Sequence, residues 1–471
     1  MKNYLNYKYI YIVGIGGSGM STLARYLKWQ GLQVFGYDAV STTLTKQLEK
    51  EGIKINYVDE VECIPKEISL NKADSLILYT TAIPVSNKTL QHLNNNKYTL
   101  IKRKDVYGDI SKKYFTIGIA GTHGKTITTA LISHIVYNSK IKMMAFLGGI
   151  AKEYNSNFIT NCSPDEVSVM IIEADEYDRF FLSLKTDISI VTTADPDHLD
   201  VYHNKKNFHD AFTEFISNST KTGYSILHKH VFEELNPLMH SYPELNKKKI
   251  LCYALNNELI RAENLSTINK DICFDYVNGP FVIENIKLPL VGLHNVENTL
   301  AVITSCLKLK LEPNEIKNNI ASFAGVNRRF NVVLESKKIV FIDDFAHHPV
   351  EIEALVSAIR LRYPNKKITL IFQPHTYTRT RDFCDGFAQS LDKADTTILL
   401  DIYPAREAPI DGIDSSVIFN KMKITRKYLC NKNNLVNFLE SINEIEILVT
   451  VGAGDISDLV EPIAFVLKER K

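Results

Sequence analysis

Short runs of apolar residues alternate with segments of helical period along most of the chain. The first run, Tyr9–Val13, is followed by a glycine-rich turn and by a helical pattern over residues 18–30, which Gly31 ends. Two further apolar runs, Gln33–Tyr37 and Ser75–Tyr79, follow in the same stretch. Uninterrupted apolar runs are typical of strands buried on both faces, and such strands alternate with helices in parallel sheets. The pattern therefore predicts an α/β fold built on parallel sheets.

The same pattern begins again twice, and it divides the chain near residues 113 and 326. The second stretch opens with the apolar run Tyr114–Ala120, a glycine turn and a helix from about Lys125. The third contains the run Ile339–Asp343 and a helix after Pro349. Further strands are expected at residues 167–174, 188–192, 368–372, 396–400 and 447–451, with an amphipathic helix from about residue 207. Residues 228–290 mix short runs with many Asn and Lys, and their elements are the least legible.

Composition and charge narrow the class of protein. A chain of 471 residues exceeds one ordinary domain, and its length suggests roughly three. The 55 basic and 54 acidic residues nearly cancel, which argues against nucleic acid or an anionic membrane as a partner. Seven cysteines are scattered without a C-x-x-C pair, and we find neither a signal-peptide pattern nor the roughly 20 apolar residues of a membrane span. We therefore expect a soluble, cytoplasmic protein.

The first glycine-rich turn predicts a site for a phosphate-bearing ligand. It fits the pattern G-x-G-x-x-G between a strand and a helix, where glycines let the backbone approach a diphosphate that the helix N-terminus stabilises. An acid at the end of the next strand is the ribose-binding position of dinucleotide folds. The pattern does not separate NAD from another nucleotide, and a glycine turn without a ligand is the plainer alternative. The residues concerned are Gly14, Gly16, Gly17, Ser18, Gly19 and Asp38.

The second glycine turn resembles a P-loop and predicts binding of a nucleoside triphosphate. In AGTHGKT, Lys125 would reach the β/γ oxygens, and the Thr126 hydroxyl would hold Mg²⁺. The turn departs from the strict pattern because Ile119 stands where the first glycine would be. Two phosphate loops in one chain suggest one nucleotide as the energy source and another as a handle on the substrate. That combination disfavours a simple dehydrogenase.

Acidic residues follow two strands of the second stretch, at the edge where open α/β sheets place their chemistry. The run Glu173-Ala-Asp175-Glu176 follows one strand, and Asp195-Pro-Asp197-His198-Leu-Asp200 follows the next. Mg²⁺ commonly takes one or two carboxylates together with substrate phosphates. Taken alone, such a run is more often a solvated turn. Downstream of a P-loop, we expect Glu173 and Thr126 to serve one ion and His198 a second position.

Eight segments occur in the order seen in the Mur ligases: GIGGSGMS, AGTHGKT, EADE, DHLD, GLHNVEN, GVNRRF, DDFAHHP and PHTYTRTRD. The chain resembles that family from about residue 9 to Gly454. The resemblance is greatest to members that join L-alanine to UDP-N-acetylmuramate. It implies a Rossmann-like domain at residues 1–112 that binds the UDP substrate, with the first glycine loop on a UDP diphosphate. It also implies a P-loop ATPase-like domain at 113–325 and a Rossmann-like domain at 326–471 that presents the amino acid.

The resemblance further implies an ATP-dependent carboxylate–amine ligase of peptidoglycan precursor synthesis, on which cell shape and division depend. Its cofactors would be ATP and Mg²⁺, its substrates UDP-N-acetylmuramate and L-alanine, and its intermediate an acyl phosphate. Lys125 and Arg329 would neutralise charge on the phosphoryl group, and His348 is our choice for the proton acceptor of the amine. The sequence leaves a monomer and a dimer equally open.

Further site residues follow from the resemblance. The implied ATP contacts are Gly121, Thr122, His123, Gly124, Lys125, Thr126, His294, Asn295, Asn298, Arg329 and Asp344. The implied metal ligands are Thr126, Glu173 and His198. The implied amino-acid contacts are His347, His348, His375, Arg379 and Arg381. Without the family, the paired histidines would be read as turn residues, the TRTR run as a solvated basic edge, and His294 as a core or capping histidine.

Three departures from the family pattern bear on the acceptor more than on the reaction. Ile127 replaces a common Thr, Phe345 replaces a frequent Tyr, and Thr376 replaces a common Arg near the expected amino-acid carboxylate. A ligase that attaches a whole tripeptide to UDP-N-acetylmuramate during recycling is therefore the nearest alternative. A nicotinamide oxidoreductase explains only the first loop and Asp38, and a non-catalytic nucleotide-binding protein leaves Lys125 and the metal acids without a role.

Overall fold

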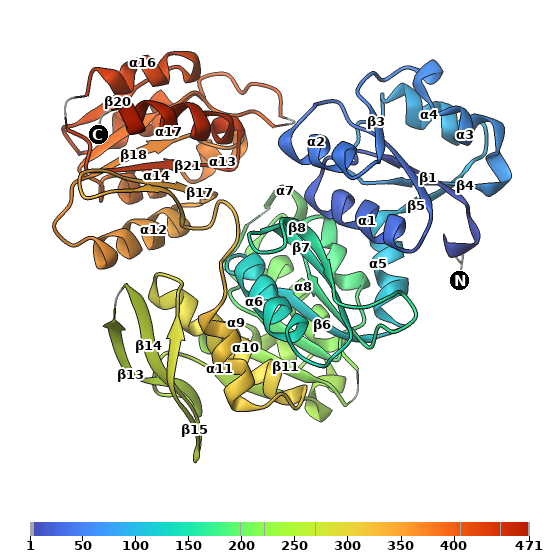
Figure 1. Ribbon diagram of the computed structural model, residues 1–471, viewed down its shortest axis with the longest axis horizontal. Coiled ribbons are helices and arrows are strands. Elements are labelled where there is room, and N and C mark those ends of the chain that lie inside the picture. The colour runs from blue at the N-terminus through green and yellow to red at the C-terminus, as the bar shows by residue number, and fades with distance from the viewer. Residues whose placement is uncertain are drawn as a thin grey trace. The chain divides into compact units, whose positions relative to one another are not determined.

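The computed structural model describes residues 4–197, 199–220, 222–268, 270–405, 407–442 and 444–469. Within these ranges the strands form three sheets in an α/β fold (Figure 1), which confirms the predicted fold class. The chain divides into two compact units. The first comprises Met1–Ser266, Cys273–Pro289 and Val296–Gly325, and the second comprises Thr267–Ile272, Leu290–Asn295 and Val326–Lys471. The predicted three-domain boundaries remain predictions. None of the described helices is long and apolar enough to cross a membrane.

The first sheet is parallel and has the order β3-β2-β1-β4-β5. Because β1 lies between β2 and β4, the glycine loop that follows β1 lies where the strand order reverses, the usual ligand position in such sheets. The predicted strands and helix are present, and α1 ends one residue before the expected Gln30. The elements are β1 Tyr9–Val13, α1 Ser18–Trp29, β2 Gln33–Tyr37, α2 Thr43–Lys50, β3 Lys54–Asn56, α3 Lys66–Leu70, β4 Ser75–Tyr79, α4 Lys88–Asn95, β5 Thr99–Lys102 and α5 Arg103–Ser111.

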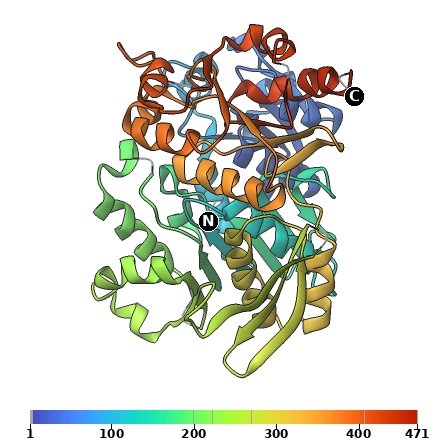
Figure 2. The same ribbon diagram turned by 90° about the vertical axis from the view of Figure 1, so that its left-hand side faces the viewer.

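The second sheet has the order β15-β14-β13-β12-β11-β10-β6-β9-β7-β8. Strands β6, β9 and β10 begin and end within two residues of their predicted bounds. Helices α6 and α8 begin within two residues of their predicted first residues. The poorly legible residues 228–290 form α9 and β12–β15, of which β13, β14 and β15 run side by side (Figure 2). The strands are β6 Phe115–Ala120, β7 Met143–Ala151, β8 Ser156–Thr160, β9 Val169–Glu173, β10 Ile188–Val191, β11 Tyr224–His228, β12 Lys249–Tyr253, β13 Ile260–Ile268, β14 Asp271–Asn278 and β15 Phe281–Leu288. The helices are α6 Lys125–Tyr137, α7 Leu199–Tyr202, α8 Lys205–Ser217, α9 Lys229–Met239, α10 Leu293–Lys308 and α11 Pro313–Ala321.

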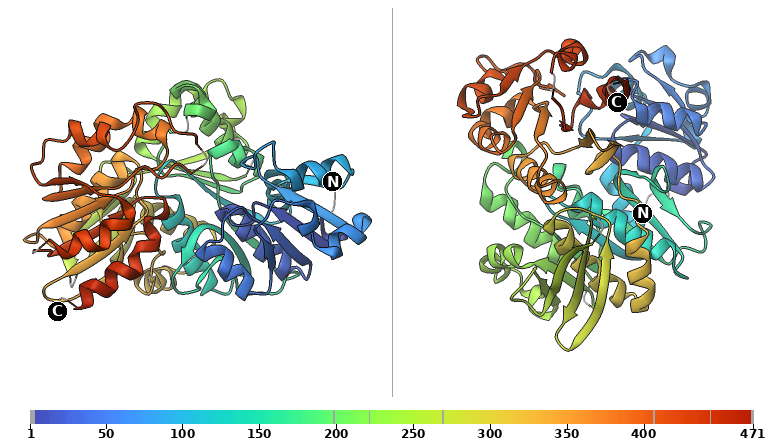
Figure 3. Two further views of the ribbon diagram at one scale, coloured as in Figure 1. Left: turned by 90° about the horizontal axis from the view of Figure 1, so that it is seen from above. Right: turned by 60° about the vertical axis from the view of Figure 1, so that its left-hand side comes forward.

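The third sheet has the order β16-β17-β21-β18-β19-β20, with β16 antiparallel to β17 and the other pairs parallel. One apolar cluster packs α12 and α14 on one face, and another packs α16 and α17 on the other (Figure 3). The run expected at Ile339–Asp343 forms its strand one residue later. The elements are β16 Asn331–Glu335, β17 Val340–Asp344, α12 Pro349–Arg362, β18 Ile368–Phe372, α13 Tyr377–Asp382, α14 Cys384–Leu391, β19 Thr396–Leu399, α15 Ser416–Lys421, β20 Lys427–Leu429, α16 Leu435–Glu440, β21 Ile447–Val451 and α17 Val460–Glu469.

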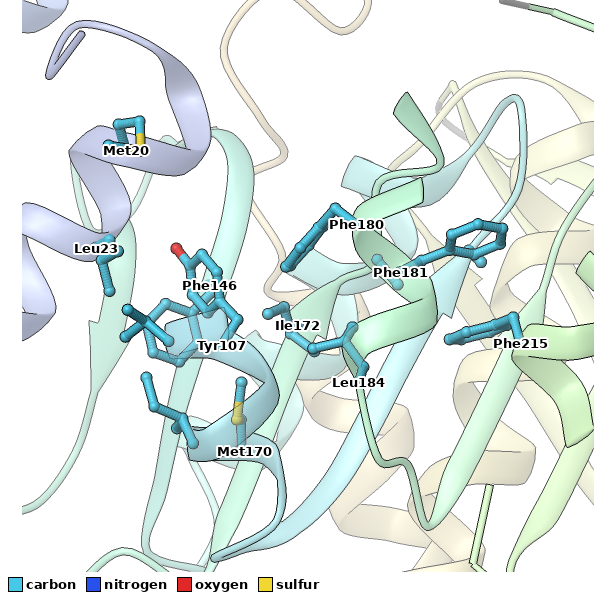
Figure 4. Close-up of a cluster of buried hydrophobic side chains, with 14 of the residues drawn as sticks. Met20, Leu23, Tyr107, Phe146, Met170, Ile172, Phe180, Phe181, Leu184 and Phe215 are labelled. Atoms are coloured by element: carbon cyan, nitrogen blue, oxygen red, sulfur yellow. The ribbon is translucent and has the colours of Figure 1, made fainter. Parts of the chain in front are cut away.

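A single buried apolar cluster joins the first sheet's helices to the second sheet (Figure 4). Tyr107 of α5 packs edge-on against Phe146 of β7 and against Phe180, with ring centroids 5.1 and 5.2 Å apart. Tyr26 of α1 lies 5.4 Å from the same Phe146 ring. Such pairs add to the free energy gained from apolar area removed from water. The cluster therefore fixes the first glycine loop relative to the carboxyl edge of the second sheet.

Candidate functional site

The P-loop connects β6 to α6, and its last glycine is the N-cap of the helix. Gly124 has φ +83°, and a Cβ there would lie 2.9 Å from the side-chain amide of Asn298. Both the left-handed backbone and this close approach require glycine. The first turn of α6 therefore presents its free N–H groups at the carboxyl edge of the sheet, where an anion is stabilised. Asn298, an implied ATP contact, lies against this loop.

The segment after β10 supports the P-loop through three hydrogen bonds. The backbone N–H of His123 donates to Thr193 Oγ1 at 2.8 Å, and Thr192 Oγ1 donates to the carbonyl of His123 at 2.5 Å. Thr122 Oγ1 donates to the carbonyl of Asp195 at 2.6 Å. The loop conformation is thus fixed by residues far from it in sequence. Sequence analysis did not single out Thr192 or Thr193, because no local pattern marks such partners.

Lys125 is held inside the site by a buried acid. Its Nζ donates to the two carboxylate oxygens of Glu176 at 2.7 and 2.9 Å and to the Gly121 carbonyl at 2.5 Å. Burial works to lower the pKa of Lys125, but the neighbouring carboxylates, Glu176 above all, raise it above its ordinary value. The amine is therefore a cation at neutral pH, poised at the loop where phosphate oxygens would lie. Glu176 belongs to the acidic run that the sequence pointed out, but its pairing with Lys125 was not predicted.

Thr126 and Glu173, the two predicted ligands of one ion, are hydrogen-bonded to each other. The Thr126 hydroxyl donates to Glu173 at 2.9 Å, and the backbone N–H of Gly148 donates to the other carboxylate oxygen at 2.7 Å. Burial raises the pKa of Glu173, which Lys125 opposes. These oxygen donors at the mouth of a phosphate loop fit Mg²⁺, which binds few protein groups and keeps water and phosphate oxygens. Within the described ranges no three His, Cys, Asp or Glu side chains converge as a complete metal centre, and the predicted ligand His198 lies outside those ranges.

Asp38 shapes the first glycine loop from within. Its Oδ2 accepts the backbone N–H of Gly16 at 2.7 Å, and its Oδ1 accepts that of Val40 at 3.3 Å. Among the described residues, no side chain caps the first turn of α1, whose N-cap is Gly17. The N–H groups of this turn therefore face the loop and are available to a diphosphate. Asp38, which was predicted to bind the ligand, thus also stabilises the first glycine loop.

The first glycine loop and the predicted metal ligand Glu173 line one cleft of about 380 Å³, part of which is open to solvent. Ser18 and Gly19 of the first glycine loop line one wall, and Gly148 and Glu173 of the second sheet line the other. Arg103, at the start of α5, lines the same cleft. The structure therefore brings the loop predicted to bind the UDP substrate close to the predicted metal ligand Glu173, which the sequence alone did not indicate. Sequence analysis also missed Arg103, which no motif marks.

In the second unit, the segment before β16 holds two arginines in a constrained backbone. Arg328 has φ +60° and Phe330 has φ +44°, both in the left-handed region. Asp344 fixes this turn, because its two oxygens accept the N–H groups of Phe330 at 2.6 Å and Ala346 at 2.8 Å. Burial raises the pKa of Asp344 to about 6, although the Arg329 charge opposes the rise. The expected ATP contacts Arg329 and Asp344 thus form one local arrangement.

The Phe345 ring contacts two cations. The guanidinium carbons of Arg328 and Arg329 lie 5.1 and 5.2 Å from the centroid of its ring, within the range of cation–π attraction. The ring also packs edge-on against His347 at 5.4 Å. The residue that departs from the family pattern is therefore part of the support of Arg329. The loss of the Tyr hydroxyl is therefore only one consequence of this replacement.

Three of the expected amino-acid contacts gather at the carboxyl edge of the third sheet. The rings of His347 and His375 lie 5.9 Å apart, and Arg379 Nη1 is 3.4 Å from His375 Nδ1. His348 caps α12, where its Nδ1 accepts the Val350 N–H at 3.4 Å. Arg381 is half exposed and donates to Asp382 at 2.7 Å. His348 as proton acceptor and Arg381 as carboxylate contact remain predictions.

Three of the implied ATP contacts, His294, Asn295 and Asn298, are on α10. His294 is exposed in its first turn, whereas Asn295 is buried and donates to the carbonyl of Val291 at 2.7 Å. Asn298 follows one turn later and lies against the P-loop. All three residues share one helix, and their contacts with ATP remain predictions.

Comparison with known proteins decides the family. Family models described as "Mur ligase family, catalytic domain", "Mur ligase middle domain" and "Mur ligase, glutamate ligase domain" match residues 9–115, 119–306 and 328–454. The UDP-N-acetylmuramate–L-alanine ligase of Cytophaga hutchinsonii is 39% identical over 462 residues, which are 98% of the chain and 97% of the relative. The chain belongs to the Mur ligase family.

Solved structures agree with this membership. The UDP-N-acetylmuramate–alanine ligase of Thermotoga maritima matches this Mur ligase with a TM-score of 0.81 and 26% identity, over 98% of the chain and 99% of that structure. The murein peptide ligase of Psychrobacter arcticus matches with a TM-score of 0.72 and 20% identity, over 98% of each chain, and shares the fold. The resemblance inferred from the eight sequence segments is thereby confirmed.

Proposed function

We propose that this Mur ligase joins L-alanine to the carboxylate of UDP-N-acetylmuramate with hydrolysis of ATP to ADP and phosphate. The observation that carries the proposal is the cleft in which the first glycine loop meets Glu173 beside the P-loop. A nucleotide substrate held on the first loop would there extend toward a phosphoryl donor on the second. The curated relative of Cytophaga hutchinsonii carries the name of this activity at 39% identity over nearly the whole chain.

The roles of the three regions follow from the proposal. Residues 1–112 bind the UDP group through the first glycine loop, residues 113–325 bind ATP, and residues 326–471 present alanine. Glu173 and Thr126, with His198, would hold Mg²⁺, which would supply charge neutralisation at the transferred phosphoryl group. All seven cysteines are free, and a reaction on nucleotide substrates among reduced thiols belongs in the cytoplasm.

Two steps account for the products. A carboxylate oxygen of the muramate attacks the γ-phosphorus of ATP, the bond from that phosphorus to ADP breaks, and an acyl phosphate and ADP result. The neutral alanine amine then attacks the acyl carbon, an amide bond forms, and phosphate leaves as the amine gives up a proton, for which His348 is our proposed acceptor. Phosphoryl transfer needs positioning and charge neutralisation more than covalent help, and Lys125 and Arg329 supply cations for it. His347, His375, Arg379 and Arg381 orient the amino acid.

The decisive measurement is phosphate release by the purified protein with ATP, Mg²⁺ and UDP-N-acetylmuramate. Single amino acids and the tripeptide L-alanyl-γ-D-glutamyl-meso-diaminopimelate are supplied separately as acceptors. Release that needs both the muramate nucleotide and L-alanine is the expected result. Release with the tripeptide alone would assign the chain to recycling and would give Phe345 and Thr376 a role in that choice. If phosphate is released with none of these acceptors, the proposal is contradicted.

A variant of the P-loop lysine tests whether the release comes from this site. Lys125→Ala removes the cation at the phosphate loop, and we expect phosphate release to fall by about a thousandfold or more. Lys140→Ala, at an exposed lysine just beyond α6, is the matched control and should retain full activity. Activity retained in the Lys125 variant would place the chemistry elsewhere.

A further inference from the structure

Arg103 is a largely buried cation that lines the cleft beside the first glycine loop and the second sheet. It is the first residue of α5, and its side chain is only 13% exposed. The guanidinium carbon lies 4.8 Å from the centroid of Phe180, so one face of the group is covered by an aromatic ring. Both Arg103 and Phe180 line the cleft that also contains Ser18 and Glu173.

The N–H donors of this guanidinium are not used within the described part of the chain. Asp175 and Asp178 each approach Nη2 no closer than 3.9 Å, which is beyond hydrogen-bond distance. Asp178 Oδ2 instead accepts the Thr81 hydroxyl at 2.7 Å, and its buried Oδ1 has no hydrogen-bond partner among the described residues. Buried polar groups almost always have partners, and a guanidinium presents five donors in a fork that matches an oxyanion.

The Arg103 guanidinium lies beside a segment of strained backbone and against a glycine. Asp178 and Arg179 have φ of +53° and +58°, a conformation that non-glycine residues adopt at a cost of roughly 1–3 kcal/mol each. On the other side, a Cβ added to Gly19 would lie 2.1 Å from Arg103 Nη1. The guanidinium therefore lies directly against the first turn of α1, where only glycine leaves room for it.

We propose that Arg103 binds an oxyanion of the nucleotide substrate, as a bidentate partner between the first glycine loop and Glu173. The inference rests on the proposed function, because it takes that substrate to be UDP-N-acetylmuramate. The first turn of α1 adds its N–H groups to the same anion. The shared chemistry is an oxyanion, and the muramate nucleotide offers two, its diphosphate and its carboxylate.

Binding is measured by calorimetry without ATP or alanine, so the result does not depend on turnover. The ligands are UDP-N-acetylmuramate and UDP-N-acetylglucosamine, which has the diphosphate but lacks the carboxylate. We expect Arg103→Met to raise the Kd for the muramate nucleotide by about 10- to 100-fold, the scale of a charge-assisted pair. Arg103→Lys keeps the cation without the fork and should recover part of the affinity. Lys112→Met, at an exposed lysine just after α5, is the matched control.

The two ligands distinguish the two oxyanions. Weaker binding of both nucleotides assigns Arg103 to the diphosphate, and weaker binding of the muramate nucleotide alone assigns it to the carboxylate. Gly19→Ala, which displaces the guanidinium but keeps its charge, should weaken the same ligands. Thermal unfolding of each variant separates loss of affinity from loss of fold.

A Kd within twofold of wild type for both ligands in a folded Arg103→Met protein would overturn the inference and leave the proposed function standing. A wild-type protein that binds neither nucleotide would overturn both.

Discussion

Lys125 and Glu176 form a pair at the P-loop in which the acid is only 2% exposed. Removing one partner leaves the other buried and uncompensated, which typically costs about 3–5 kcal/mol. We therefore expect Lys125→Met to lower the free energy of unfolding by about 3 kcal/mol as well as to abolish activity. The double variant Lys125→Met with Glu176→Gln should recover much of the stability and none of the activity, as measured by urea unfolding and phosphate release. Equal stability of the single variant and wild type would contradict the pairing.

Asp344 gives the second unit a pH dependence whose sign follows from its burial. Its pKa is raised to about 6, so the folded protein holds the proton more tightly than the unfolded chain, where Asp titrates near about 3.9. This contribution to stability is present below about pH 4 and is lost as the pH rises to about 6.

Relative to Asp344→Asn, the wild type should lose up to about 3 kcal/mol between these pH values. Urea unfolding of both proteins at pH 4, 5, 6 and 7 measures the difference. A difference that grows in favour of the wild type with rising pH would show that the sign is wrong.

At the scale of elements, the P-loop depends on the segment that follows β10. Thr193→Val keeps the shape of the side chain but removes the acceptor of the His123 N–H, which is bonded at 2.8 Å. A lost hydrogen bond of this kind costs about 1–3 kcal/mol when the donor stays buried. We expect the KM for ATP to rise by about five- to twentyfold and the free energy of unfolding to fall by about 1–3 kcal/mol. Thr425→Val, at an exposed threonine of the second unit, should leave both quantities unchanged. An unchanged KM in Thr193→Val would mean that the loop holds its shape without this bond.

The elements that the sequence predicted are those whose signal is local. An apolar run followed by glycines and a helix marks β1, β6 and their loops without ambiguity. Strand β15 was missed because only three of its eight residues are buried, in no regular alternation, and β13 is exposed over most of its length. The same holds for the candidate site: the two glycine loops were predicted from local sequence, whereas the residues that hydrogen-bond to them were not. Thr193 is 70 residues from the His123 N–H that it accepts, and such pairs arise only when the chain folds.

At the scale of the molecule, polar contacts reinforce the apolar joint between the first sheet and the second. Arg25 of α1 binds the Glu51 carboxylate with Nε at 2.9 Å and Nη2 at 2.7 Å, and its Nη1 donates to Asn157 of β8. Asn157 in turn donates to the carbonyl of Ser18 at 3.2 Å, directly at the first glycine loop. We expect Asn157→Ala to destabilise this joint by about 1–3 kcal/mol and to raise the KM for the muramate nucleotide.

Trp29, the chain's single tryptophan, reports on this joint because its ring lies 5.6 Å from Phe158 of β8. Urea unfolding followed by its fluorescence should show the lower midpoint in Asn157→Ala. The exposed substitution Asn95→Ala on α4 is the control and should match wild type. Identical midpoints in both variants would mean that the apolar cluster alone holds the joint.

The apolar cluster shared by α1, α5 and β7 also constrains how members of this family can exchange parts. A hybrid gene that takes its first 112 codons from one parent would set one parent's Tyr26 and Tyr107 against the other parent's Phe146. Buried neighbours tolerate little change in volume. Where the parents' side chains differ in size at these contacts, the hybrid therefore contains a cavity or a steric clash. Viable recombinants must carry both sides of the seam together, so the first two sheets are expected to evolve as one inherited block.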